Sequence, residues 1–254
     1  MQEFAVFFLC HPQTQNMTTP LTHILCLDVE TTGQSPRTSD MLELAACVWE
    51  IGSQAPKDRK YYFFGFEDVK WCPVTWDEFW NNQDKGKDGK TPVQRLRERI
   101  RDDGVKATTI GEAAVDFMLW AREWYKRTDG KIIVLTDTSG FDYAFVSDML
   151  ARIVALPDKA EDKTLPLSLS YLMGKYQPVR DINSWYLGMG GTLQKYGARD
   201  LMVARLDIEW PDWVLKWDHD HNPQNDCAGI AAKAAYVLSL EQEKQPAKRP
   251  KLRK

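Results

Sequence analysis

Two carboxylates in the first quarter of the chain stand at a spacing that suits metal chemistry. Asp28 and Glu30 come at the end of the apolar segment 22–28. If that segment is a β-strand, both side chains project from one face, because strand side chains alternate with a period of two. Two such carboxylates repel each other unless a cation or a proton lies between them. The same pattern alone also fits a solvated strand end followed by an acidic turn.

Two later segments carry further candidates. Asp142 follows the apolar segment 131–136 and comes at the expected start of a helix, where an acid can also simply complement the helix dipole. His221 precedes Asp226 by five residues. We therefore expect His221 on the loop before the last helix and Asp226 within its first turns, although a lone histidine is more often a surface residue.

The elements that must position these residues can be read from hydrophobic pattern and turn chemistry. A meander of three strands, a capped helix, a buried parallel strand and two more helices indicate a layered α/β or α+β domain. The expected strands are 22–28, 41–50, 61–66 and 131–136, and the expected helices begin at Thr109, run over 141–156, and run from Pro223 to about Leu240. Gly188 begins an insertion of undefined form.

Taken together, three segments resemble the motifs of the DEDDh 3′–5′ exonucleases of the DnaQ-like group. They are Asp28-Val-Glu30-Thr-Thr-Gly33, Gly140-Phe-Asp142 and His221-x4-Asp226, in this order. Met41-Leu-Glu43-Leu is similar to the family's second strand, including its inward glutamate. Segments 75–80 and 178–182 resemble the phage exonuclease A-like and exoribonuclease-like branch. The resemblance spans residues 21–240 and implies an α/β, ribonuclease-H-like fold with a mixed five-stranded sheet flanked by helices.

The resemblance also implies a reaction, the hydrolysis of phosphodiester bonds from a 3′ end of single-stranded DNA or RNA to nucleoside 5′-monophosphates. Two Mg²⁺ or Mn²⁺ ions would be held by Asp28, Glu30, Asp142 and Asp226, since hard cations prefer carboxylate oxygens. His221 would be the general base, a role for which histidine is suited near neutral pH. Thr31, Thr32 and Gly33 would contact the substrate.

Two positions depart from the family's pattern. Thr138 stands where an asparagine is usual, four residues before Asp142, and Gln34 stands where an apolar wedge is common. Asp137 is the reserve candidate for the role of Asp142. His219 is a weaker candidate for the general base than His221, because Gln224 and not an aspartate follows it at the five-residue offset.

Composition excludes several classes of protein. The 254 residues are 43% hydrophobic, too apolar for a disordered chain, and no uncharged apolar run approaches the roughly 20 residues that span a bilayer. Five cysteines without CxxC spacing predict reduced, structural thiols in an intracellular protein rather than disulfides or a zinc site. No membrane partner is expected.

Charge separates the C-terminal end from the rest of the chain. Residues 241–254 hold six basic and two acidic side chains, so the remainder of a chain with a net charge of −3 has a net charge of −7. An acidic body argues against broad adhesion to nucleic acid but is compatible with an acidic metal site. The basic cluster from Pro246 onward resembles a nuclear localisation signal and equally fits a phosphate-binding arm. We expect an N-terminal extension at 1–20, an exonuclease domain at 21–240 and a disordered basic tail at 241–254, with Met17 as an alternative start.

Other functions remain open at this point. The chain could be a catalytically silent nucleic-acid-binding module on the same fold, or could recruit a protein partner through 188–220 or the tail. Most of the ten tryptophans are expected in core or interface faces, with base stacking as the alternative. The alternating arginines from Arg95 to Arg101 are expected on a solvated helix face, with a phosphate-contacting ridge as the alternative.

Overall fold

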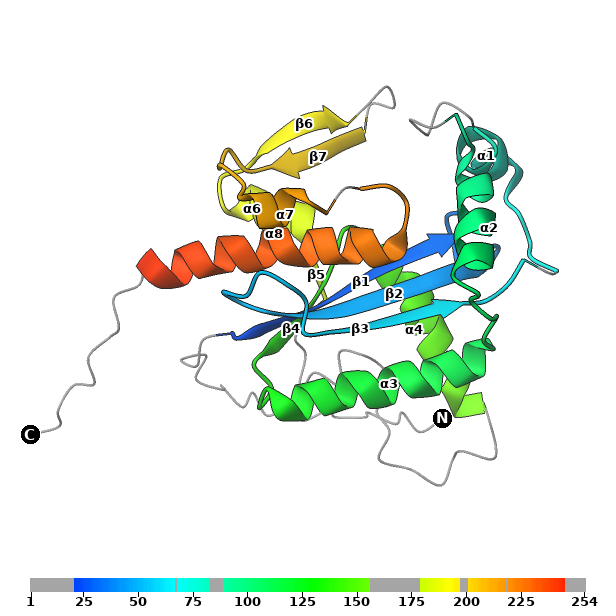
Figure 1. The fold of residues 1–254 in the computed structure, drawn as a ribbon, viewed down its shortest axis with the longest axis horizontal. Coiled ribbons are helices and arrows are strands. Elements are labelled where there is room, and N and C mark those ends of the chain that lie inside the picture. The colour runs from blue at the N-terminus through cyan, green and yellow to red at the C-terminus, as the bar shows by residue number, and fades with distance from the viewer. Residues whose placement is uncertain are drawn as a thin grey trace, which may run out of the picture.

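The computed structural model describes residues 21–66, 68–82, 89–155, 179–196, 201–217 and 219–244 (Figure 1). The predicted N-terminal extension at 1–20 and the basic cluster from Pro246 onward lie outside the described residues.

Five strands form one mixed sheet, in the order β3-β2-β1-β4-β5. The first three strands form the predicted antiparallel meander, and β4 and β5 continue the sheet in parallel with β1. The bounds are β1 His23–Thr31, β2 Met41–Glu50, β3 Asp58–Phe63, β4 Ile132–Thr136 and β5 Arg180–Asp181. The mixed five-stranded sheet confirms the predicted fold class.

Helices cover both faces of this sheet. Helix α8 lies across one face, and α3 and α4 lie across the other (Figure 1). The bounds are α1 Pro73–Thr75, a π-helical turn Trp76–Trp80, α2 Pro92–Asp102, α3 Ile110–Arg127, α4 Asp142–Ala151, α6 Ile182–Gly188, α7 Asp212–Leu215 and α8 Pro223–Lys244. Within the described ranges, none of these helices combines the length and apolar character that crossing a bilayer requires.

Strand β1 is buried on both faces, and its alternation decides where the acidic residues point. Leu25 and Leu27 pack into the core beneath α3 and α4, whereas Ile24 and Cys26 pack into the core beneath α8. Because side chains alternate, the even-numbered row continues from Cys26 toward the end of the strand on the α8 side. The period-two pattern therefore directs both carboxylates of β1 toward α8.

Helix α8 approaches the sheet closely because the residues that face it are small. Its buried side chains include Ala228, Ala231, Ala232 and Ala235, all fully shielded from solvent. A row of alanines lets the helix backbone lie near β1 and β2, which brings the first turn of α8 to the end of β1.

Several boundaries differ from the sequence-based expectation. The third strand spans 58–63 rather than 61–66, and α4 ends at Ala151 before a 3₁₀ turn, Arg152–Ala155. Helix α8 continues to Lys244, so the first residues of the predicted tail are helical. The insertion after Gly188 contains a two-stranded hairpin, β6 Thr192–Tyr196 and β7 Leu201–Arg205.

A hydrogen-bonded carboxylate ties the start of β3 to α3. Asp58 Oδ2 accepts hydrogen bonds from the indoles of Trp120 and Trp124, at 2.8 and 2.9 Å. Burial acts to raise the pKa of Asp58, but these two hydrogen bonds, a third from the Arg59 backbone N–H and the charge of Lys60 together outweigh it, so the pKa is lowered. A lowered folded-state pKa means that the stabilisation is complete above the unfolded-state pKa and is lost as the pH falls through the folded-state pKa.

We therefore expect Asp58→Ala to lower the free energy of unfolding at pH 7 by about 1.5–3 kcal/mol, the usual range for hydrogen bonds to a charged group. The difference from wild type should narrow only below about pH 4. Urea denaturation at pH 7 and pH 3 measures both values. Asp129→Asn is the control, since the Asp129 carboxylate is 92% exposed. If the difference in free energy of unfolding between wild type and Asp58→Ala is the same at both pH values, the proposed dependence on the charge of Asp58 is contradicted.

Candidate active site

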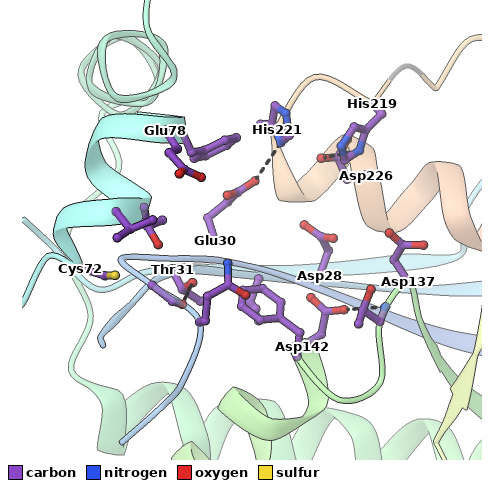
Figure 2. Close-up of a pocket in the computed structure, with 18 residues that line it drawn as sticks. Asp28, Glu30, Thr31, Cys72, Glu78, Asp137, Asp142, His219, His221 and Asp226 are labelled. Carbon is purple, nitrogen blue, oxygen red and sulfur yellow. Dashed lines mark hydrogen bonds and ion pairs between the residues drawn. The ribbon is translucent and has the colours of Figure 1, made fainter. Parts of the chain in front are cut away.

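A cavity of about 330 Å³ lies where β1 ends, and it is bordered by α4, the start of α8 and the segment that contains α1. Figure 2 shows carboxylates and imidazoles converging on it. The residues that line it are Asp28, Val29, Glu30, Thr31, Gly33, Gln34, Cys72, Val74, Thr75, Glu78, Phe79, Asp137, Thr138, Phe141, Asp142, His219, His221 and Asp226. All five residues predicted to be catalytic are therefore brought to one cavity from three separate regions of the sequence.

Asp28, Glu30 and Asp226 form the tightest acidic group. One carboxylate oxygen from each lies within 4.8 Å of the other two. Asp226 comes from the first turn of α8, where its Oδ1 accepts a hydrogen bond from the backbone N–H of Asp220 at 3.2 Å. Its Oδ2 is buried and lies 3.2 Å from His219 Nδ1. Three carboxylate oxygens at this spacing fit a divalent cation.

Asp142 stands apart from this group at the first residue of α4. Its Oδ2 accepts a hydrogen bond from the backbone N–H of Thr138 at 3.1 Å. Thr138, which stands where the resembled family usually has an asparagine, therefore contacts Asp142 through its backbone N–H rather than through its side chain. Burial raises the pKa of Asp142 to about 7, with the charge of Asp137 contributing.

The acidic residues of β1 are electrostatically unfavourable when all are ionised. Burial raises the pKa of Asp28 well above its ordinary value, and the charges of Asp142, Asp226 and Glu30 raise it further. Burial also raises the pKa of Glu30. Each shift means that the ionised carboxylate is disfavoured, so the cluster favours a bound proton or cation.

His221 lies on the loop before α8, as predicted. Its backbone has a φ of 59°, a left-handed conformation that is uncommon outside glycine, and its Nδ1 is 4.0 Å from Glu30 Oε1. Its ring packs edge-on against Phe79, with centroids 4.7 Å apart and planes at 80°. The imidazole is thus held at the rim of the acidic group from the opposite side to β1 (Figure 2).

The structure also brings in two residues that the sequence analysis ranked second. His219 Nδ1 lies 3.2 Å from Asp226 Oδ2, and Asp137 lines the same cavity, where Asn183 Nδ2 donates to its Oδ1 at 3.2 Å. Burial raises the pKa of Asp137. In the sequence, the five-residue offset to Asp226 favours His221 over His219, and Asp137 is indicated only as the reserve candidate for the role of Asp142.

The three predicted substrate contacts after Glu30 divide into two kinds. Thr31 and Gly33 line the cavity, and the Thr31 hydroxyl donates to the Gly33 carbonyl at 2.7 Å. Thr32 does not line the cavity, so its contact with substrate stays a prediction. Its side chain is fully buried, and its hydroxyl donates to the Lys70 carbonyl at 2.6 Å and accepts from the Asp40 backbone N–H at 2.8 Å. The β-bulge between Glu30 and Thr31 disrupts the alternation and turns the chain at this point.

Gly33 is required by packing. A Cβ at this position would contact the buried Ser39 hydroxyl too closely and would lie 2.7 Å from Cys72 Cβ. We expect Gly33→Ala to lower the free energy of unfolding by about 1–3 kcal/mol, because overpacking a buried site forces neighbours apart. Urea denaturation measures this change, with Gly140→Ala as the control, since a Cβ at Gly140 meets nothing within 4 Å. Equal stability of the two variants would contradict the packing explanation.

A buried ion pair lies behind Glu30. Glu43 is paired with Glu30 across β1 and β2, and its two oxygens accept hydrogen bonds from Arg99 Nη2 at 2.5 and 2.6 Å and from the Tyr61 hydroxyl. The Arg99 side chain is 17% exposed. Arg99 therefore lies neither on a solvated helix face nor on a phosphate-contacting ridge, the two interpretations of the arginines from Arg95 to Arg101. It neutralises Glu43, next to the site.

The outer wall of the cavity comes from the segment 72–79. Val74, which is 61% exposed, and Phe79 give it apolar surface, and Phe141 does so from the other side. Trp80 fixes the segment, because its buried Nε1 donates to the Thr31 carbonyl at 2.8 Å. All ten tryptophans lie in the described part of the chain and none lines the cavity, which agrees with structural roles for them.

No protein-family model matches the sequence, and no curated protein matches it in a sequence search. Among solved structures, the fold is similar to E. coli exonuclease I in complex with a dT13 oligonucleotide, with 14% identity, a TM-score of 0.50 and coverage of 88% of this chain and 42% of that chain. Exonuclease I from Methylocaldum szegediense has 15% identity, a TM-score of 0.48 and coverage of 88% and 41%. Cell-death related nuclease 4 has 13% identity, a TM-score of 0.43 and coverage of 87% and 65%.

The chain thus spans about two fifths of the length of the exonuclease I structures that it resembles. At these identities the likeness concerns the fold. The strand order, the helices on both faces and this similarity together identify an α/β, ribonuclease-H-like fold, shared with E. coli exonuclease I.

Proposed function

We propose that the chain is a metal-dependent 3′–5′ exonuclease that hydrolyses single-stranded DNA or RNA to nucleoside 5′-monophosphates. The observation that carries this proposal is the convergence of Asp28, Glu30, Asp142 and Asp226 with His221 on one cavity. Buried carboxylates that cannot all ionise alone are costly to a fold, so their grouping points to function rather than stability.

The donor set fits divalent cations. Asp28, Glu30 and Asp226 offer carboxylate oxygens within 4.8 Å of one another. Two Mg²⁺ or Mn²⁺ ions bound by these residues and Asp142 would shield phosphate charge, activate water and assist the leaving oxygen. Asp142, set apart and held by the Thr138 N–H, suits the second ion.

The other side chains have positioning and proton-transfer roles in this proposal. His221 takes the proton of the attacking water, since its imidazole borders Glu30 and is held by Phe79. Arg99 and Tyr61 keep Glu43 compensated, so that Glu30 is left to face the cavity.

The cavity suits the end of a flexible strand. Its apolar wall of Val74, Phe79 and Phe141 can contact a base, whereas its floor is acidic and suits a metal-bound phosphate. The similar structure of E. coli exonuclease I holds a dT13 oligonucleotide, which supports a single-stranded substrate here. Its fold alone does not select DNA over RNA, so both are tested.

The test uses single-stranded DNA and RNA of the same sequence, labelled at the 5′ end. Each is incubated with the full chain in Mg²⁺, in Mn²⁺ and in EDTA. We expect a ladder that shortens from the 3′ end only with metal, and the faster polymer identifies the preferred substrate. A 3′-phosphate-blocked strand serves as a polarity control.

The alternative of a silent nucleic-acid-binding module predicts a different result. Binding of labelled strands without cleavage in either metal would support that alternative and overturn the exonuclease proposal. Recruitment of a protein partner through 188–220 or the tail stays a prediction.

A further inference from the structure

A second set of donor atoms adjoins the acidic group, and its chemistry differs. His219, His221 and Asp226 each offer one ligand atom, and these three atoms lie within 4.8 Å of one another. Both histidines come from the short loop before α8, and Asp226 comes from the first turn of that helix (Figure 2). The set therefore contains two imidazole nitrogens and one carboxylate oxygen.

The geometry of this set leaves a carboxylate oxygen directed at the imidazoles. The imidazole rings of His219 and His221 have centroids 4.6 Å apart and planes at 68°. The Asp226 side chain is 1% exposed, and its Oδ2 lies 3.2 Å from His219 Nδ1. A buried carboxylate beside two imidazoles is an arrangement that one metal ion can bridge.

Donor type decides which ion each set prefers. Mg²⁺ selects oxygen ligands, which Asp28, Glu30 and Asp226 provide, whereas Zn²⁺ accepts two histidines and one carboxylate with a fourth position open to water. The donors of a tetrahedral zinc ion lie roughly 3.3 Å apart. The His219 side chain is 46% exposed, so a change of its rotamer can shorten the remaining separation.

We propose that His219, His221 and Asp226 form a zinc-binding site. This site adjoins the acidic group of Asp28, Glu30 and Asp226 and shares Asp226 with it. Because one carboxylate belongs to both sets, zinc and magnesium compete. Zinc bound here also occupies His221, so it inhibits hydrolysis. This inhibitory consequence rests on the proposed function, whereas zinc binding itself does not.

Binding is tested on the metal-free full chain with Co²⁺ as a spectroscopic probe and Zn²⁺ as competitor. We expect one Co²⁺ ion to give the intense visible bands of four-coordinate cobalt and to be displaced by Zn²⁺. His219→Asn should weaken Zn²⁺ binding at least about 100-fold in calorimetry, because it removes one of three ligands, and loss of a residue that only orients a ligand already costs about 10- to 100-fold. Asp28→Asn, which removes an oxygen from the acidic group only, should retain the cobalt bands.

A matched control and a measurement on the wild type keep the test decisive. His23→Asn replaces a histidine on β1, outside the cavity lining, and should bind Zn²⁺ as wild type does. Imidazole ¹⁵N signals of wild type should shift for His219 and His221 and not for His23 when Zn²⁺ is added. Unchanged His219 and His221 signals, or wild-type zinc affinity in folded His219→Asn, would overturn the site.

Activity is measured separately, so the two proposals can fail independently. In constant Mg²⁺, added Zn²⁺ should inhibit wild type, and the inhibitory concentration should rise in His219→Asn. A chain that binds zinc as described but never cleaves nucleic acid would overturn the exonuclease proposal and leave the zinc site standing. A chain that cleaves but shows no histidine-dependent zinc binding would do the reverse.

Discussion

Asp28→Asn is expected to reduce the rate of metal-dependent shortening of a labelled strand by roughly 100- to 1,000-fold. The amide keeps the shape of the side chain but removes a charged ligand from the acidic group. Bound metal ions contribute several kcal/mol to phosphoryl chemistry, and each 1.36 kcal/mol is about tenfold in rate. The rate is measured by gel with saturating Mg²⁺ and equal enzyme concentrations.

The same substitution separates function from stability. Asp28 is surrounded by other carboxylates whose charges raise its pKa, so removal of its charge relieves repulsion in the metal-free chain. The variant should therefore unfold in EDTA at the same temperature as wild type or a higher one, and Mg²⁺ should raise that temperature less than it does for wild type. Asp102→Asn, which alters a carboxylate that is 63% exposed, is the control. An Asp28→Asn protein with near-wild-type cleavage would remove Asp28 from the proposed metal site.

His221→Asn is expected to lower kcat by about 10²- to 10⁴-fold while KM and the affinity for Mg²⁺ change little. General-base catalysis typically contributes a factor of this size. Asparagine is chosen because His221 has a φ of 59°, and asparagine tolerates the left-handed conformation better than most residues. The variant thus removes the imidazole without straining the loop before α8.

Steady-state kinetics and Mg²⁺ titration by thermal shift measure the two halves of this prediction. His23→Asn is the matched control for loss of a histidine, and it should cleave at the wild-type rate. His219→Asn in the same assay shows whether the second imidazole contributes to turnover. Unchanged kcat in His221→Asn would exclude His221 as the general base, and a large loss of Mg²⁺ affinity would assign it to metal binding instead.

Local pattern was informative where one short segment determined its own structure. The segment 41–50 was predicted with its observed bounds, since ten mostly apolar residues leave few alternatives to a buried strand. The capping box of Thr109 and Glu112 marked the start of α3, because both partners lie within one turn. The end of α8 was less predictable, because the polar residues 241–244 carry no stop signal and the helix continues through them.

Local pattern was insufficient where a residue's role depends on a distant partner. Arg99 looks like one of several solvated arginines, but it neutralises Glu43, which is 56 residues away in the sequence. Thr32 belongs to a motif whose neighbours line the cavity, yet the bulge before it turns its side chain into hydrogen bonds with Lys70 and Asp40. Neither outcome has a signal in the sequence near the residue.

The candidate site shows the same division. The strand period at Asp28 and Glu30, the helix starts at Asp142 and Asp226 and the resemblance to the motifs of a known family indicated these four side chains, and they do line one cavity. Only the tertiary structure decided that His219 and Asp137 join them, because both lie on loops whose course depends on how α8 and α6 pack against the sheet. Periodicity constrains residues within one element, whereas the contacts between loops are set by the packing of all the elements that carry them.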